Sequence, residues 1–226
     1  MSGHTIAITG ANRGIGLELA RLFSARGDHV IGLCRRAGDD LPATGAEIID
    51  GVDVTSADEL RAAAQRIGDR HIDILINVAG ILTSEDFDGL GDPEAVGRIL
   101  RQYEVNALGP LLATHAFAGH LPAGSKVALI TSRMGSIGDN DSGGQYGYRM
   151  SKSALNAAGK SLSIDLAARR IAVGIFHPGF VRTEMTGYNG QLEPAESAAL
   201  LAERIDELQL DNAGRFLHAN GEVLPW

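Results

Sequence analysis

The sequence has little cysteine, no excess of basic residues and no long apolar run. With one cysteine, Cys34, among 226 residues, the chain can form neither an intrachain disulfide nor a zinc site of several thiolates. The 28 acidic residues outnumber the 20 basic ones, which argues against general nucleic-acid binding. No apolar stretch reaches the roughly 18 residues of a membrane span, and the N-terminus lacks the pattern of a signal peptide. We therefore expect a cytoplasmic protein that binds neither nucleic acid nor membranes.

Short apolar runs alternate with segments of helical periodicity along the whole chain. This alternation is typical of βαβ units around a parallel sheet, and parallel strands need crossovers that cover both faces of the sheet. The length favours one domain over two. We predict a single doubly wound α/β domain over residues 1–226, with a seven-stranded parallel sheet, helices on both faces and ligands bound beyond the carboxyl ends of the strands. The expected strands are 5–9, 29–34, 46–50, 72–77, 126–131, 172–177 and 215–218, and the expected helices are 14–25, 56–67, 93–120, 147–168 and 194–208.

A glycine-rich turn follows the first expected strand. It reads Gly10-Ala11-Asn12-Arg13-Gly14-Ile15-Gly16 and leads directly into an amphipathic helix. Glycines let the backbone approach a ligand closely, and a helix N-terminus offers free N–H groups and a positive dipole end. The spacing differs from the GxGxxG fingerprint, and a turn of this kind can also be purely structural. Its place after the first strand favours a site for a pyrophosphate.

Arginines stand where a dinucleotide site selects its cofactor. An acidic residue about 20 positions after the glycines binds a ribose 2′-hydroxyl, whereas arginine accommodates a 2′-phosphate. The sequence has Arg35 and Arg36 there, and Arg13 in the glycine turn adds a third positive group. The alternative is that Arg35 and Arg36 are ordinary surface charges, close in sequence to Asp39 and Asp40. We predict a preference for NADP(H) over NAD(H).

Tyr148 is followed four residues later by Lys152, which places the two side chains on one helix face. No other tyrosine in the chain has this spacing. A unit charge about 4 Å away at an effective dielectric near 20 is worth about 4 kcal/mol. Lys152 is therefore expected to pull the phenol pKa from about 10 towards neutrality, making Tyr148 an acid/base group. The alternative is a tyrosine packed on the helix with the lysine in solvent.

Three further polar segments lie near expected strand ends. Ser132 follows the fifth strand, the segment 77–80 (Asn-Val-Ala-Gly) follows the fourth, and the segment 178–183 follows the sixth. Serine after a strand is common turn chemistry. Asn106 stands inside a long expected helix, where an amide is unfavourable, and is expected to bond a helix carbonyl or to kink the helix near Gly109-Pro110.

Together these motifs resemble the short-chain dehydrogenase/reductase family, and the resemblance spans almost the whole chain. The region 146–152, with His177-Pro178-Gly179, is most similar to the C-factor-like or sniffer-like carbonyl reductase branch. Val78 departs from the family's Asn-Asn-Ala-Gly segment, where Asn77 keeps the strand-stabilising amide. The resemblance implies a Rossmann fold and a catalytic tetrad of Asn106, Ser132, Tyr148 and Lys152. The implied cofactor residues are Gly10, Asn12, Arg13, Gly14, Ile15, Gly16, Arg35, Asp53 (at the adenine), Val54, Asn77, Ala79, Gly80, Tyr148, Lys152, Pro178, Gly179, Val181 and Thr183.

The resemblance also implies hydride transfer between a nicotinamide and a carbonyl or alcohol substrate. Tyr148 would donate the proton, Ser132 would bind the carbonyl oxygen, Lys152 would stabilise tyrosinate and bind the nicotinamide ribose, and Asn106 would hold a water that relays protons. We expect 138–144 to be a mobile loop and 183–193 a short lid. A small hydrophobic substrate is expected from the loop residues Ile81, Leu82, Met134, Tyr146, Phe180, Met185 and Tyr188, which can equally be packing residues.

Other functions remain open at this point. A signalling or regulatory protein could use the dinucleotide site as a sensor with little turnover. A hydrolase is disfavoured because the sequence has neither a Gly-x-Ser-x-Gly elbow nor His-Glu-x-x-His. The 7 histidines are scattered without metal-ligand spacing, so no metal site is expected. The long helices 93–120 and 147–168 carry residues that suit a homodimer or homotetramer interface, or burial against the sheet.

Overall fold

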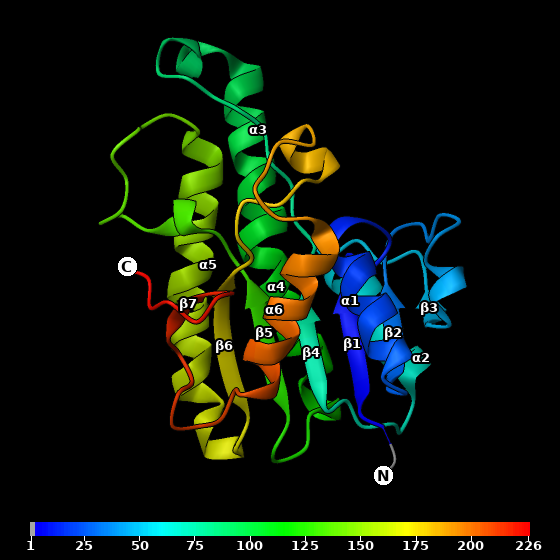
Figure 1. Cartoon of the computed structure of the whole chain (residues 1–226). Helices are drawn as coiled ribbons and strands as arrows, with labels where there is room; N and C mark the ends of the chain where they lie inside the picture. Colours follow the sequence, from blue (N-terminus) through cyan, green and yellow to red (C-terminus); the bar gives the residue numbers. More distant parts are fainter. Residues whose placement is uncertain (1–2) are drawn as a thin grey trace.

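Seven parallel strands form one sheet in the computed structural model, which describes residues 3–226 (Figure 1). Their order is β3-β2-β1-β4-β5-β6-β7, so the direction of winding reverses between β1 and β4. In sheets of this topology, ligands bind outside the carboxyl ends of the strands at the reversal. The predicted seven-stranded, doubly wound Rossmann sheet is confirmed. The strands are β1 (Thr5–Thr9), β2 (His29–Leu33), β3 (Glu47–Ile49), β4 (Ile74–Asn77), β5 (Lys126–Ile130), β6 (Ala172–His177) and β7 (Phe216–His218).

Helices cover both faces of the sheet. Figure 1 shows α1 and α6 side by side in front of the strands. The other face is covered by α2, α4 and α5, and α3 packs against α5. The helices are α1 (Gly14–Ala25), α2 (Ala57–Ile67), α3 (Pro93–Tyr103), α4 (Gly109–Phe117), α5 (Tyr146–Asp165) and α6 (Pro194–Asp206).

The central strands are apolar throughout because both of their faces are buried. Along β1, Ile6 and Ile8 pack into the apolar cluster under α1 and α6, whereas Ala7 packs into the opposite cluster. Successive side chains of a strand point to opposite faces, so a strand covered on both sides needs apolar residues at every position. The register pairs Ile8 with Ile76 of β4. The two cores hold β1 and β4 in place, and with them the loops that follow these strands.

The expected single helix 93–120 is wrong in its centre. A π-helical segment, Glu104–Leu108, separates α3 from α4, and the backbone N–H of Gly109 donates to the carbonyl of Glu104, five residues earlier. Pro110 has no N–H to continue an α-helical ladder, and the Asn106 side chain bonds outside the helix. The predicted disturbance near Gly109-Pro110 is thus a π segment, a feature that often occurs at functional sites.

The remaining predicted elements are present, with ends that agree or differ by one to three residues. The expected helix 56–67 begins one residue later because Ser56 is its N-cap, and the Ser56 hydroxyl accepts the N–H of Glu59 at 3.2 Å. The expected helix 147–168 begins at Tyr146 and ends at Asp165, followed by a 3₁₀ turn. The segment 183–193 contains a 3₁₀ turn at Glu184–Thr186.

The outer surface of α3 carries exposed apolar side chains, among them Val96, Leu100 and Tyr103. They are compatible with the predicted homo-oligomer, which stays a prediction. None of the helices in residues 3–226 has both the length and the continuous hydropathy of a transmembrane span.

Two glycines on neighbouring helices give a matched test of how tightly α5 packs on the sheet. A Cβ at Gly159 would lie 2.8 Å from Ile175 Cγ1 and 2.8 Å from Leu129 Cδ1, whereas a Cβ at Gly97 on α3 would meet no atom within 4 Å. We predict that Gly159→Ala lowers the free energy of unfolding by about 1–3 kcal/mol through overpacking. Gly97→Ala should raise it by about 0.5–1 kcal/mol through helix propensity. Denaturant unfolding measures both, and equal effects would contradict the packing described.

Candidate active site

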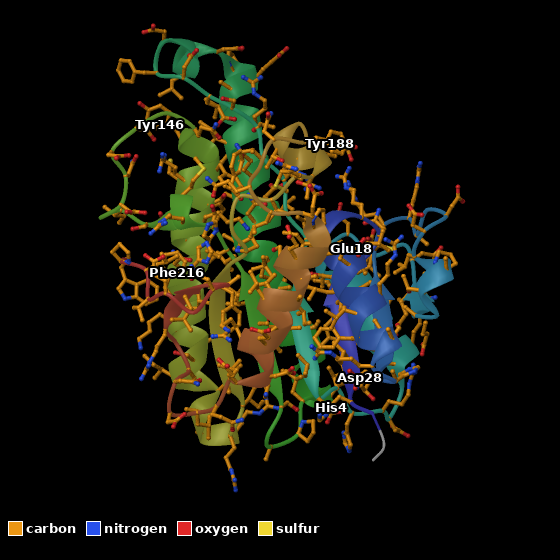
Figure 2. All side chains as sticks on the ribbon, viewed as in Figure 1. His4, Glu18, Asp28, Tyr146, Tyr188 and Phe216 are labelled. Carbon is orange, nitrogen blue, oxygen red and sulfur yellow. The ribbon has the colours of Figure 1, made fainter. Side chains whose placement is uncertain are left out.

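A cavity of about 1020 Å³ lies at the carboxyl ends of the strands. Its walls come from the loops after β1, β2, β3, β4, β5 and β6, from α3 and from the start of α5. Figure 2 shows Tyr146 and Tyr188 at this end of the molecule, and His4 and Asp28 at the opposite end. The cavity is at the upper limit of typical ligand pockets, which occupy roughly 300–1,000 Å³. It is large enough for a dinucleotide together with a small substrate.

The glycine turn forms one wall of the cavity. Gly10 has a φ of +69°, and a Cβ there would lie 2.8 Å from the Cα of Ala79. Only glycine therefore fits between β1 and the loop after β4. Gly16 does not line the cavity; a Cβ there would lie 2.3 Å from the Gly10 carbonyl. Its absent side chain lets α1 pack close to the turn, and the predicted contact of Gly16 with the cofactor stays a prediction.

The positive groups of the cavity divide into paired and unpaired arginines. Arg13 forms an ion pair with Glu184, which joins the glycine turn to the segment after β6. Arg35 and Arg36 line the cavity, and neither guanidinium has an ion pair or a side-chain hydrogen bond within residues 3–226. Asp40 lies 3.8 Å from Arg21 rather than pairing with either of them. Two free guanidinium groups thus face the end of the cavity where a 2′-phosphate is expected.

Asp53, the predicted adenine contact, is held by a network of its own. Its Oδ1 accepts the Thr55 N–H at 2.9 Å and the Thr55 hydroxyl at 2.7 Å, and its Oδ2 accepts from Arg101 Nη2 at 3.1 Å. Burial raises the pKa of Asp53, but the Thr55 bonds and the Arg101 charge outweigh it and hold the pKa below its ordinary value. Arg101 also lines the cavity. The sequence analysis missed Arg101 because nothing in its helical surroundings distinguishes it from a surface arginine.

Tyr148 and Lys152 are both buried on the face of α5 that meets the end of the sheet. Lys152 Nζ donates to the carbonyl of Ile130 at 3.0 Å and lies 5.8 Å from the centre of the Tyr148 ring. Both residues line the cavity. Ser132 is buried directly after β5, and its hydroxyl accepts the N–H of Met134 at 3.2 Å. The alternative with the lysine in solvent is therefore excluded.

Burial, and not the neighbouring charge, dominates the titration of this pair. Desolvation raises the pKa of Tyr148, and the hydrogen-bonding interaction with Ser132 opposes this only in part. Desolvation also lowers the pKa of Lys152 to about 8. The expectation that Lys152 pulls the phenol towards neutrality is wrong for the protein alone, because removal from water disfavours both charged forms. At neutral pH the phenol is protonated and the lysine carries a charge.

Asn106 is fully buried, and its side-chain amide is used by the protein. Its Oδ1 accepts the N–H of Ile81 at 2.8 Å, and its Nδ2 donates to the Ile81 carbonyl at 2.8 Å and to the Ser151 hydroxyl at 3.0 Å. Asn106 thereby fastens the loop after β4 to α5. Both ends of the amide are engaged by protein partners, and the implied role of Asn106 in holding a relay water stays a prediction.

Most of the predicted cofactor residues line the cavity, and four do not: Gly16, Asn77, Gly179 and Val181. Asn77 is buried in β4, where its Nδ2 donates to Thr114 Oγ1 at 3.3 Å. Val181 is buried and forms a bridge with Leu192. Ser132 and Asn106 are not among the residues that line the cavity, but Ser132 adjoins it through its hydrogen-bonding interaction with the phenol of Tyr148. Among the predicted substrate residues, Ile81, Met185 and Tyr188 line the cavity, whereas Leu82, Met134, Tyr146 and Phe180 do not.

His177 lies at the end of β6 and does not line the cavity. Burial, with smaller contributions from the charges of His218, Arg133 and Lys152, lowers the pKa of His177 to about 3, so its ring is neutral at physiological pH. The His177 and His218 rings pack edge to face, with centres 4.9 Å apart. Within residues 3–226, no three His, Cys, Asp or Glu side chains gather in a way that suits a metal ion.

The chain matches the family described as short chain dehydrogenase over residues 4–193. It is 38% identical to 1-hydroxy-2-glutathionyl-2-methyl-3-butene dehydrogenase of Rhodococcus sp. (strain AD45), over 98% of this chain and 99% of that protein. It is also 40% identical to the C-signal of Myxococcus xanthus, over 74% of this chain and 100% of that protein. The chain therefore belongs to the short-chain dehydrogenase/reductase family.

Comparison with solved structures shows which members of the family the chain resembles in structure. The carbonyl reductase Sniffer of D. melanogaster superposes with a TM-score of 0.89 at 29% identity, over 99% of this chain and 100% of that one. A carbonyl reductase from Pseudomonas aeruginosa PAO1 in complex with NADP gives a TM-score of 0.87 at 32% identity, over 100% of both chains. The protein is an oxidoreductase of this family, close to C-signal and to the Sniffer carbonyl reductase structures, as its motifs predict.

The burial of the Lys152 charge is expected to lower the free energy of unfolding of the protein at neutral pH. In the unfolded chain Lys152 keeps its proton up to a pKa of 10.5, and in the folded protein only up to about 8. Because the unfolded state binds more protons between these values, stability rises with pH across this range. We predict that Lys152→Met raises the free energy of unfolding at neutral pH by about 1–3 kcal/mol, with a smaller gain near pH 10.

Urea unfolding at both pH values checks this, with Lys160→Met on the exposed side of the same helix as the matched control. The control is expected to change the free energy of unfolding by less than about 0.5 kcal/mol. Equal effects of the two substitutions at neutral pH would contradict the burial described for Lys152.

Proposed function

We propose that this protein is an NADP(H)-dependent oxidoreductase that transfers a hydride between nicotinamide and the carbonyl or alcohol of a small hydrophobic substrate. The observation that carries the proposal is the composition of one cavity. Buried Tyr148 and Lys152 stand in its wall, and the free guanidinium groups of Arg35 and Arg36 stand in the same cavity. A proton donor and a site for a 2′-phosphate are thus parts of one binding site.

The residues present fit the dinucleotide. The Gly10 turn leaves no room for a side chain beside Ala79, so backbone N–H groups at the start of α1 are free to approach a pyrophosphate. Arg35 and Arg36 would hold the 2′-phosphate, and Asp53, fixed by Arg101, would face the adenine. When bound, the cofactor supplies the hydride at the nicotinamide ring or accepts it there. The protein supplies orientation and the proton.

In the reducing direction, Tyr148 donates its phenolic proton to the substrate oxygen. Its raised pKa keeps this proton in place at neutral pH. Lys152 is charged below its pKa of about 8 and stabilises the tyrosinate that is left behind. The Ser132 hydroxyl, next to the phenol, hydrogen-bonds the same substrate oxygen. Together these groups favour negative charge on that oxygen in the transition state.

The substrate end of the cavity is apolar. Ile81, Met185 and Tyr188 line it, which suits an aldehyde or ketone with a hydrophobic body. The Rhodococcus relative is named for a hydroxyl compound that carries a glutathionyl group. A substrate panel of aromatic and aliphatic aldehydes and ketones should therefore also include glutathione conjugates with a hydroxyl group.

A second candidate is a signalling protein that binds the dinucleotide and turns over slowly. The identity to C-signal is the observation in its favour. The two functions are separated by kcat on the panel with NADPH. Turnover in the ordinary enzymatic range of about 1 s⁻¹ or more supports catalysis as the role, and tight NADPH binding without turnover supports signalling.

Removing the phenol oxygen tests the proton donor. We predict that Tyr148→Phe lowers kcat by at least about a hundredfold, because general acid catalysis is lost, and leaves the Kd for NADPH within about twofold. Steady-state NADPH oxidation and fluorescence titration measure the two quantities. Tyr103→Phe, the same change on the exposed side of α3, is the control and should match the wild type. Unchanged turnover in Tyr148→Phe removes this residue from the mechanism.

Removing one free arginine tests the cofactor preference. A hydrogen bond to a charged group is worth about 1.5–3 kcal/mol, so Arg35→Ser is expected to raise the KM for NADPH by about tenfold or more. The KM for NADH, which has no 2′-phosphate, should change by less than about threefold. Arg61→Ser, on the exposed side of α2 and paired with Asp58, is the matched control. Equal changes for both cofactors would contradict a phosphate site at Arg35.

A further inference from the structure

Glu85 carries a buried carboxylate outside the residues that line the cavity. It lies in the loop after β4, and its side chain has no exposed surface. Its Oε1 accepts from the Thr83 hydroxyl at 2.6 Å and from Gln102 Nε2 at 3.1 Å. Its Oε2 accepts the backbone N–H of Gly147 at 3.2 Å. Arg98 Nε is 3.9 Å from Oε1. The carboxylate is therefore surrounded by donors from the loop, from α3 and from α5.

These bonds replace the missing cap of α5. The helix begins at Tyr146, and its N-cap residue, Gln145, has a left-handed φ of 52° and makes no side-chain capping bond. Glu85 supplies acceptors instead. Its carbonyl accepts the N–H of Gln145 at 2.9 Å, and its carboxylate accepts the N–H of Gly147. A negative group at a helix N-terminus is also favoured by the helix dipole. The first turn of α5, which contains Tyr148, is thus fastened by a residue 62 positions away in sequence.

The contact between Glu85 and the start of α5 also requires that residue 147 has no side chain. A Cβ at Gly147 would lie 2.3 Å from Gln102 Nε2 and 3.0 Å from Glu85 Oε2. Gln102 is fully buried, and its Oε1 accepts the N–H of Thr83 at 3.0 Å. Its amide orientation is therefore set by two partners. A glycine must precede Tyr148 if the carboxylate and the amide are to reach the helix start.

Stability alone does not explain a charge at this place. A buried carboxylate has a large desolvation cost, and apolar packing often serves a fold equally well. The hydrogen bonds from Thr83, Gln102 and Gly147 compensate the charge. They connect the loop that continues from the cavity wall at Ile81 to the helix that carries Tyr148 and Lys152. Asn106 makes a second connection between the same loop and α5 one turn further on.

We propose that Glu85 is a positioning residue for the reaction, one that fixes the first turn of α5 and with it the phenol of Tyr148. This inference rests on the proposed function. Glu85 touches neither the cavity nor the proposed substrate, so it acts through the backbone of Gly147 and the orientation of Gln102. A change at Glu85 should lower the fraction of molecules in which the Tyr148 phenol is positioned to donate its proton. It should leave the cofactor site at the other end of the cavity unchanged.

The test compares Glu85→Gln with Glu94→Gln. Both carboxylates lie within 4.0 Å of Arg98, but Glu94 is exposed on the first turn of α3. Glu85→Gln keeps the size of the side chain and places an NH₂ group among donors. We expect its kcat to fall at least about tenfold on the best substrate of the panel, with the Kd for NADPH within about twofold. Glu94→Gln should match the wild type in both.

Two further readouts separate positioning from a loss of fold. Hydrogen exchange at the amides of residues 145–149 is expected to be at least about tenfold faster in Glu85→Gln, with residues 155–165 of the same helix unchanged. In a double-mutant cycle, Glu85→Gln should have little further effect on kcat in the Tyr148→Phe background, because its effect passes through the phenol. If Glu85→Gln retains full kcat, accelerates exchange along the whole helix, or lowers kcat equally in both backgrounds, the inference is wrong.

The hydrogen-exchange readout does not depend on turnover. If the wild-type protein reduces nothing in the panel, the proposed function fails, while the local exchange at 145–149 still decides whether Glu85 holds the start of α5. If the wild type turns over and Glu85→Gln leaves both kcat and local exchange unchanged, the positioning inference fails and the proposed function stands.

Discussion

The site depends on the burial of a phenol and an ammonium group one helical turn apart on α5. Lys152 is held under the end of β5 by the Ile130 carbonyl, and Tyr148 is buried beside it. Removal from water raises the pKa of the phenol and lowers that of the amine. Without a compensating anion, the pair therefore consists of a protonated phenol next to an ammonium group that loses its proton more readily than an exposed lysine does. A phenol is protonated at neutral pH at its ordinary pKa, and burial strengthens this preference for the protonated form.

The surroundings of this pair are hydrogen-bonded polar networks, in contrast to the apolar cores on either side of the sheet. Asn106 fastens Ile81, Glu85 fastens Gly147, and Arg101 fastens Asp53, and each of these contacts joins elements far apart in the sequence. Buried polar groups that are fully satisfied fix a single arrangement more sharply than apolar packing does. The cores hold the strands in register, whereas these networks set the loops at the strand ends and so shape the cavity.

Local patterns predicted the elements and the pairs that lie close in sequence. Alternating apolar runs were sufficient for the sheet, and the i, i+4 spacing was sufficient to bring Tyr148 and Lys152 to one face. Spacing says nothing about desolvation, so the direction of the Tyr148 shift was predicted wrongly. Contacts such as Arg13 with Glu184 or Glu85 with Gly147 depend on how distant loops meet, and no periodicity encodes them. A disturbance of the helix near Gly109-Pro110 was predicted, but its π-helical geometry was not, because its cause includes a side-chain bond to a different loop.

In the proposed function, one cavity would hold both a reduced nicotinamide and the acid that protonates the substrate oxygen. The most direct measurement is transfer of label from NADPH deuterated at nicotinamide C4, on the face that the enzyme uses, to the product, followed by mass spectrometry of the alcohol. We predict one deuterium on the carbinol carbon of each product molecule when the correct face is labelled. An alcohol formed without label from NADPH labelled on either face, or no alcohol formed while NADPH remains bound, would contradict it.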